Sequence, residues 1–500
     1  MEQFAQWFIE FFQELINNLW GLIKGFAKGF YNLIIGYPIQ YAKSFLETSK
    51  NFAFMDWVLA IFSIIIFIFL IFMILGVIYQ LLKRYFRFTK IEYQKLDLLN
   101  RINVLERKLK KQSLPFQENF NKLSHQNQLT TKKEQRPKTS RFVRLNQIDE
   151  KYKYAILPTP MTQEDKLTLS QLVTRFRDYA AYEHKLYYDR KTIATFIAGM
   201  AVSKIMILEG ISGTGKTSLP YAFGKFIKND ATIISVQPSW RDRFEMIGYL
   251  NEFTKKFSET EFLTAVYEAN YRTDIQMIVL DEMNLARVEY YFADFLSLLE
   301  LPNKEEWMLN LIPEQLPGDP MGLKEGKMKI APNIWFVGTA NKDDSTFAIT
   351  DKVYDRASSI EMNSKAEKFE IKPTKPINLS YDYLETLFSL ALESHSISPN
   401  VMEAIIKLDQ HIAETFEVTF GNRILKQLEN FVPVFMACGQ EEISGVDYII
   451  ARKVIRKFES LNLPFLQKEL EELLVICDKL FGKDKLFETK KMIQKFLRYV

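Results

Sequence analysis

The spacing of hydrophobic positions changes several times along the chain, and each change marks a predicted element. Short apolar runs at 205–208, 232–236, 276–280 and 333–338 are typical of buried strands. Strands that alternate with helices predict an α/β core with a parallel sheet, and helices alone after residue 380 predict an α-helical region. Apolar residues three and four positions apart predict these helices, at residues 167–188, 192–203, 219–227, 259–270, 381–394, 400–414, 423–436, 448–458 and 466–500.

The longest apolar run covers residues 57–79 and contains no charged side chain. A run of that length is enough to cross about 30 Å of hydrocarbon as a helix. We therefore expect a transmembrane helix over residues 54–82 that contacts the lipid bilayer through 57–79. Residues 81–101 carry six Lys and Arg residues, whereas residues 37–56 carry two. This asymmetry predicts a single-pass protein of the cell membrane whose C-terminal catalytic part is cytoplasmic.

Three further segments flank this apolar run. Residues 1–50 place aromatic and apolar side chains close to helical spacing, which predicts an amphipathic helical region that lies on the membrane surface or packs against a partner. Residues 83–110 predict a juxtamembrane helix or a short coiled coil. Residues 111–141 are rich in Gln, Lys, Asn, Ser and Thr, and they predict a flexible linker before a folded body that begins near residue 142.

A phosphate-binding motif follows the first predicted strand of that body. Residues 210–218 fit the pattern G-x-x-x-x-G-K-[ST], with a predicted strand before them and a predicted helix after them. The glycines permit turns that present backbone N–H groups to phosphate oxygens, and the lysine adds a positive charge. The threonine hydroxyl is the expected Mg²⁺ ligand. We therefore expect a nucleotide to bind Gly210, Ile211, Ser212, Gly213, Thr214, Gly215, Lys216, Thr217 and Ser218.

Polar residues end two later strands in positions that suit nucleotide hydrolysis. Asp281 and Glu282 directly follow the strand 276–280. Asp281 is expected to bind Mg²⁺ together with Thr217, and Glu282 to polarise the attacking water as a base. Asn341 follows the strand 333–338, whose end should lie beside the phosphate loop in an open parallel sheet. We therefore expect Asn341 to orient the water or the terminal phosphate.

Two short patterns after that strand bear on nucleotide choice and on assembly. Residues 341–344 spell N-K-x-D, which in G-proteins recognises guanine. No D-x-x-G follows the phosphate loop in a suitable position, and Glu282 supplies a base, so we interpret this match as a coincidence. Arg356 is a candidate to reach the terminal phosphate of a neighbouring subunit, where a guanidinium would stabilise transition-state charge. The alternative for Arg356 is a surface ion pair with Asp355.

The order and spacing of these motifs resemble AAA+ ATPases, and in particular the McrB/MoxR-like branch (dynein-related AAA domains), over about residues 165–460. The resemblance implies a P-loop NTPase core with a five-stranded parallel sheet over residues 142–370, and an α-helical lid with further helices over 371–500. It also implies a ring, usually hexameric. In such a ring Asn341 would be sensor 1, Arg356 the arginine finger acting in trans, and Arg423 the residue at the sensor 2 position.

Other features refine this picture. The residues after Asn341 differ from the McrB pattern, which leaves the choice between ATP and GTP open. Segment 301–332 resembles an inserted hairpin, which either faces a ring pore or is a passive loop. The net charge of +4 gives no general argument for nucleic-acid binding. Cys438 and Cys477 lack metal-ligand spacing and are expected to be buried and reduced, and the four scattered histidines suggest no metal besides Mg²⁺.

The function expected from the sequence is that of a membrane-anchored AAA+ ATPase. It would couple hydrolysis of ATP, with Mg²⁺, to remodelling of a protein or nucleic-acid client at the cytoplasmic face. One alternative is a GTP-dependent McrB-type motor subunit that works with a separately encoded nuclease. Another is a nucleotide-gated membrane scaffold that hydrolyses slowly.

Overall fold

The computed structural model describes residues 25, 32, 36–51, 53–55 and 57, and residues 140–498 apart from 154, 342–345 and 364–365. The chain divides into two compact units, residues 1–133 and 134–500. The second unit contains every residue that the sequence predicts to act at the nucleotide site.

The described part of the first unit contains helix α2 (Tyr37–Thr48) and the 3-10 turn η2 (Ser49–Asn51). The 12 residues of α2 span about 18 Å, whereas the hydrocarbon core of a bilayer is about 30 Å thick. No helix among the described residues is long and apolar enough to cross a membrane. The expected transmembrane helix over residues 54–82, and the expected location in the cell membrane, are therefore wrong for the described part of the chain. Residues 58–139 lie outside it, and they include most of this expected helix, the juxtamembrane segment 83–110 and nearly all of the linker 111–141.

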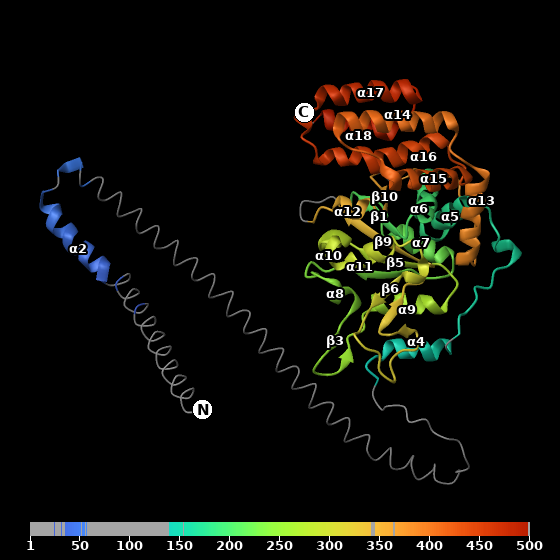
Figure 1. Ribbon diagram of the computed structural model, residues 1–500, viewed down its shortest axis with the longest axis horizontal. Helices are drawn as coiled ribbons and strands as arrows, with labels where there is room; N and C mark the ends of the chain where they lie inside the picture. The colour runs from blue at the N-terminus through green and yellow to red at the C-terminus, as the bar shows by residue number, and fades with distance from the viewer. Residues whose placement is uncertain are drawn as a thin grey trace, which may run out of the picture. The chain divides into compact units, whose positions relative to one another are not determined.

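A five-stranded parallel sheet forms the centre of the second unit (Figure 1). The strands lie across the sheet in the order β10 (Ser358–Glu361), β1 (Ile205–Gly210), β9 (Ile334–Asn341), β5 (Gln276–Asp281) and β2 (Thr232–Ser235). Strands β1, β9 and most of β5 are buried on both faces, which explains their nearly continuous apolar sequences. This sheet fits an α/β P-loop fold.

The register of the strands brings the chemically important residues to one edge. Gly210 at the end of β1 is paired with Asn341 at the end of β9, and Ser235 at the end of β2 is paired with Asp281 at the end of β5. The carboxyl ends of the parallel strands therefore meet at the same edge, which is where ligands bind in open α/β sheets.

Helices cover both faces of this sheet. One hydrophobic core joins a sheet face to α5 (Leu169–His184), α6 (Arg190–Val202) and α7 (Ser218–Phe226), and it continues into the C-terminal helices. In Figure 1 most of those helices, in orange and red, gather at one end of the unit. They are α13 (Tyr381–Ser394), α14 (Pro399–Phe416), α15 (Gly421–Ala437), α16 (Glu442–Ile449), α17 (Gln467–Phe481) and α18 (Phe487–Leu497).

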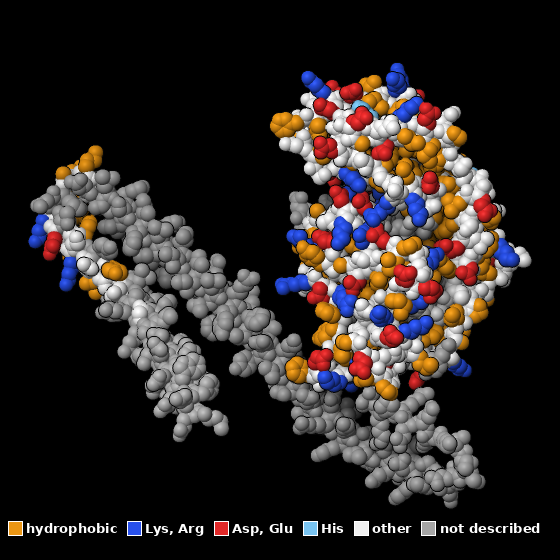
Figure 2. Space-filling model, in the orientation of Figure 1, with side chains coloured by type: hydrophobic (Ala, Val, Ile, Leu, Met, Phe, Trp, Pro, Cys, Tyr) orange, Lys and Arg blue, Asp and Glu red, His pale blue; other side chains and the backbone are white. Residues whose placement is uncertain are grey.

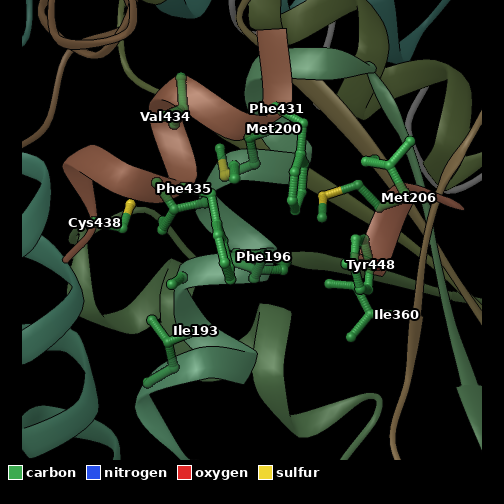
Figure 3. Close-up of a cluster of buried hydrophobic side chains, with 14 of the residues drawn as sticks. Ile193, Phe196, Met200, Met206, Ile360, Phe431, Val434, Phe435, Cys438 and Tyr448 are labelled. Carbon is green, nitrogen blue, oxygen red and sulfur yellow. The ribbon is translucent and has the colours of Figure 1, made fainter. Parts of the chain in front are cut away.

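The packing of α15 against α6 connects the C-terminal helices to the sheet. Phe431 and Phe435 of α15 lie beside Phe196 and Met200 of α6, with Tyr448 of α16 close by (Figure 3). The rings of Phe431 and Tyr448 are stacked at 5.1 Å. All of these side chains are at most 5% exposed, so separating the two layers would expose a large apolar surface to water.

A second core covers the opposite face of the sheet. It includes Phe336 of β9, whose ring lies 5.1 Å from that of Phe295 and 5.8 Å from that of Phe262. The helices on this side are α4 (Arg144–Tyr152), α8 (Arg243–Ile247), α9 (Glu261–Glu268), α10 (Val288–Tyr291), α11 (Ala293–Leu298) and α12 (Asp351–Tyr354). The phosphate-loop strand β1 therefore lies between two buried layers, which hold it in place.

Segment 301–332 forms a small antiparallel sheet. Its strands are β6 (Met308–Asn310), β8 (Lys327–Lys329) and β7 (Leu323–Lys324), and Trp307 beside them is buried. The hairpin predicted from the sequence is therefore present as β7 and β8, while its position at a ring pore stays a prediction. A second hairpin, β3 (Leu250–Asn251) with β4 (Lys256–Phe257), was not predicted.

The C-terminal helices differ from the predicted ones in two places. The expected helix 448–458 is the end of α16 followed by the π-helix η8 (Ile450–Val454) and the 3-10 helix η9 (Ile455–Ser460). The expected helix 466–500 is divided, because Gly482 ends α17 with a φ of 102° that other residues rarely adopt. Cys438 and Cys477 are free and buried, as expected.

Candidate nucleotide site

The phosphate loop connects β1 to α7 and has the backbone geometry that its sequence predicts. Gly210, Gly213 and Gly215 have φ values of 141°, 79° and 89°, a region in which side chains with a Cβ are strained. A Cβ on Gly210 would also lie 2.4 Å from the carbonyl oxygen of Met362. The ammonium group of Lys216 donates to the carbonyls of Gly210 and Ile211, at 3.1 and 2.8 Å. The lysine thus lies across the loop, where a phosphate would bind.

Asp281 joins the phosphate loop to the acidic strand. Its Oδ1 accepts a hydrogen bond from Thr217 Oγ1 at 2.6 Å and another from Thr339 Oγ1 at 2.8 Å. Thr217 ends the phosphate loop, Asp281 ends β5 and Thr339 lies in β9 between them. The two predicted metal ligands, Thr217 and Asp281, are therefore in direct contact.

Glu282 and Asn341 form a second pair at the same edge. Glu282 has a left-handed backbone conformation, with a φ of 55°, and its N–H donates to Thr339 Oγ1 at 2.9 Å. Asn341 Nδ2 donates to Glu282 Oε1 at 2.6 Å. The amide oxygen of Asn341 is buried and has no hydrogen-bond partner among the described residues. That oxygen can therefore accept a hydrogen bond from a water or ligand.

Three residues that support this pair were not predicted from the sequence. Asn284 donates from Nδ2 to the carbonyl of Asn341 at 2.8 Å and so fixes the end of β9. Gly338 permits close contact with the acidic turn, since a Cβ there would lie 1.9 Å from Met283 Sδ. Thr339 is a third such residue. Its place at the strand end was visible, but its contact with Asp281 depends on the strand order.

A cavity of about 1390 Å³ opens beside the phosphate loop. Its lining includes Thr214 of the loop, Asn341 of β9, Tyr188 before α6 and Arg452 in η8. Tyr188 also donates to the carbonyl of Gly215 at 3.0 Å. Side chains of α18 complete the lining, and Figure 2 shows Lys and Arg side chains gathered on the face below the C-terminal helices. The cavity is large enough for a nucleoside triphosphate.

Arg452 is the best-connected cation of this cavity. It forms an ion pair with Glu361 at the end of β10, and it lies 3.9 Å from Glu209 and 3.8 Å from Glu488. Burial alone would lower the pKa of Arg452, but the carboxylates, with Glu361 first, outweigh burial and raise it. The Nε atoms of Arg452 and Arg456 are buried without a hydrogen-bond partner among the described residues. The segments η8 and η9 thus present two guanidinium groups to the cavity.

Arg356 and Arg423 lie elsewhere. The carbonyl of Arg356 accepts from Ser203 at 2.7 Å, and Ser203 precedes β1. Arg356 is thus at the amino edge of the sheet, and the six residues of β1 place the phosphate loop about 20 Å away. Arg423, at the start of α15, shares the carboxylate of Glu300 with Arg356. The structure therefore brings Thr217, Asp281, Glu282 and Asn341 to the phosphate loop, but not Arg356 or Arg423.

The residues at the carboxyl edge fit a nucleotide with Mg²⁺. The loop supplies a glycine-rich turn and Lys216 for the phosphates, and Thr217 with Asp281 supplies the hydroxyl and carboxylate oxygens that Mg²⁺ prefers. Among the described residues no group of three or more His, Cys, Asp or Glu could hold another metal ion. Mg²⁺ that binds here would therefore take its remaining ligands from phosphate and water.

Comparisons with known proteins add little to this geometry. No family model matches the chain, and no curated protein matches it. Among solved structures, the chain is similar to a “putative ATPase” from Cytophaga hutchinsonii, with 13% sequence identity and a TM-score of 0.40. The similarity covers 71% of this chain and 96% of that one. It is too low to support a function by itself.

Proposed function

We propose that residues 140–498 form a Mg²⁺-dependent nucleoside triphosphatase. Two hydrogen bonds at the carboxyl edge of the sheet carry the proposal: Thr217 to Asp281 and Asn341 to Glu282, both at 2.6 Å. They gather a phosphate-loop hydroxyl, a carboxylate for the metal, a second carboxylate and an amide that orients it. This is the set of groups that positions terminal phosphates and directs a water toward them.

Each residue has a distinct task in this proposal. Lys216 exchanges its two carbonyl partners for phosphate oxygens, and the loop N–H groups bind the same phosphates. Thr217 and Asp281 would hold Mg²⁺, which screens the phosphate charge when bound. Glu282 accepts a proton from the attacking water, and Asn341 holds the carboxylate of Glu282 in place for that transfer.

The lid contributes to the same site in this proposal. Arg452 and Arg456 line the cavity that Thr214 and Asn341 also line, and both are at most 11% exposed. A guanidinium in such a place binds phosphate strongly. We therefore assign the positive charge that the lid adds to a nucleotide of the same chain to Arg452 and Arg456.

The proposal takes ATP as the nucleotide, with GTP as the alternative. It places the chain in a ring, with six copies expected, in which hydrolysis remodels a protein or nucleic-acid client. The position of Arg356 about 20 Å from the phosphate loop of its own chain supports shared sites, because this side chain can reach a terminal phosphate only on another copy.

Nucleotide binding tests the proposed site most simply. Titration calorimetry of the full chain with ATP and with GTP, each with Mg²⁺, should show binding to the wild type. Lys216→Ala should weaken it about 100-fold, since a charged donor to the phosphates is lost. The matched control is Lys225→Ala, because Lys225 lies on the next helix and pairs with Asp230 at 2.6 Å. Equal affinities of wild type and Lys216→Ala would contradict the site.

A further inference from the structure

Glu300 holds two arginines that come from different layers of the second unit. Its Oε2 lies 3.0 Å from a guanidinium nitrogen of Arg356, and its Oε1 lies 2.8 Å from one of Arg423. Glu300 follows α11, Arg356 precedes β10 and Arg423 begins the lid helix α15. One carboxylate thus joins the α/β core to the lid at the amino edge of the sheet.

Neither arginine can serve the nucleotide of its own chain. Arg356 lies at the amino end of β1 and the phosphate loop at its carboxyl end, about 20 Å away. Arg423 shares a carboxylate with Arg356 and so lies at the same edge. Gln427, one turn further along α15, donates to the carbonyl of Asp355 at 3.1 Å, which fixes this end of the helix beside Arg356.

Positive charge exceeds negative charge at this edge. Lys457 pairs with Asp355 at 3.4 Å. The charged cations here are Arg356, Arg423 and Lys457, and the acidic side chains are Glu300 and Asp355. Such an edge attracts an anion.

We propose that Glu300 is a positioning residue that holds Arg356 and Arg423 as a pair and competes with the terminal phosphate of a second copy for both. The proposal rests on the triphosphatase function above. Arg423 then acts in trans beside Arg356, and not on the nucleotide of its own chain. In the isolated chain the pair is bound to Glu300, and contact with a nucleotide-loaded neighbour replaces that carboxylate with phosphate.

The exposures of the three groups make this exchange feasible. The side chains of Glu300, Arg356 and Arg423 are 30%, 18% and 51% exposed, so water screens both ion pairs and neither is strong. A terminal phosphate carries more negative charge and accepts bidentate bonds from arginine. Removal of the charge on Glu300 should therefore raise the affinity of the two arginines for the phosphate of a neighbour by about three- to tenfold.

The test measures how nucleotide turnover by the full chain depends on protein concentration. Wild type should turn over faster per subunit as concentration rises, because each site needs arginines from a neighbour. Glu300→Gln should reach half-maximal turnover at a concentration about three- to tenfold lower. Glu429→Gln is the matched control, since Glu429 is exposed on the same helix as Arg423. The proposal would be overturned if Glu300→Gln reached half-maximal turnover at the same protein concentration as wild type, or at a higher one.

Mixtures of variants test the trans role of Arg423 independently of Glu300. Arg423→Ala should lower turnover and recover it when mixed with Glu282→Gln, which keeps both arginines but lacks the base. Lys426→Ala, an exposed site one turn along α15, should behave as wild type. No recovery at any ratio would overturn the role of Arg423. Wild type that is no faster than Glu282→Gln would instead refute the triphosphatase function itself, so the two failures are distinguishable.

Discussion

Replacement of Asn341 by alanine tests the most specific contact of the candidate site. The amide nitrogen of Asn341 donates to Glu282 Oε1 at 2.6 Å, while its backbone carbonyl is held separately by Asn284. Asn341→Ala therefore removes the group that orients the carboxylate and leaves the strand end anchored. The phosphate loop and its contact between Thr217 and Asp281 are unchanged.

The size of the effect follows from the kind of bond that is lost. A hydrogen bond to a charged group contributes about 1.5–3 kcal/mol. If the bond holds Glu282 in position throughout proton transfer, its loss raises the barrier by that amount. Each 1.36 kcal/mol corresponds to tenfold in rate, so kcat should fall about 10- to 150-fold. Asn341→Asp should reduce kcat at least as much, because it places a second carboxylate against Glu282.

Steady-state hydrolysis and nucleotide affinity must be measured together. Asn341→Ala should lower kcat while the Kd for nucleotide stays within about twofold of wild type, since no phosphate-binding group is removed. Asn400→Ala, at an exposed position of α14, is the control. An unchanged kcat would refute the role of Asn341 in holding the base. A loss of affinity with unchanged kcat would show that Asn341 binds the nucleotide instead.

Two further predictions concern stability. Burial lowers the pKa of Lys453 to about 7, whereas an unfolded lysine titrates near 10.4. Between about pH 7 and 10 the unfolded chain therefore binds a proton that the folded chain does not, and stability should rise by up to about 1.4 kcal/mol per pH unit. In Lys453→Met the midpoint of chemical denaturation should rise less with pH than in wild type. An identical pH dependence in the two proteins would contradict the lowered pKa of Lys453. Asp447 is 4% exposed and accepts from the backbone N–H groups of Glu488 and Thr489 at 2.7 and 2.8 Å. Asp447→Ala should cost about 1–3 kcal/mol by leaving these donors unpaired, and unchanged hydrogen exchange in α18 would contradict this.

The parts of the site that the sequence predicts are those with a strong local pattern. The phosphate loop needs its glycines within nine residues, and Asp281 with Glu282 directly follows a continuous apolar strand. Both patterns can be recognised in a single sequence because each lies within one turn or at one strand end. The contact of Thr339 with Asp281 depends instead on β9 lying beside β5, which spacing along the chain does not encode.

Strand β10 and the two arginines of η8 and η9 show why the rest was missed. Ser358 and Ser359 of β10 are polar yet at most 4% exposed, so no apolar run marks this strand. Among the C-terminal helices, the π-helix η8 shifts the phase of the helix between α16 and η9. Helical periodicity places Arg452 and Arg456 on one face because they are four residues apart, but it does not predict that this face lines the cavity.

Turnover by Glu282→Gln measured beside wild type, at saturating nucleotide and Mg²⁺, tests the central claim most directly. Glutamine keeps the shape of the side chain and an oxygen for Asn341, but it cannot accept a proton from water. The account predicts that kcat falls by two orders of magnitude or more, on the scale of a lost general base, while nucleotide still binds. Equal kcat values for the two proteins would contradict it.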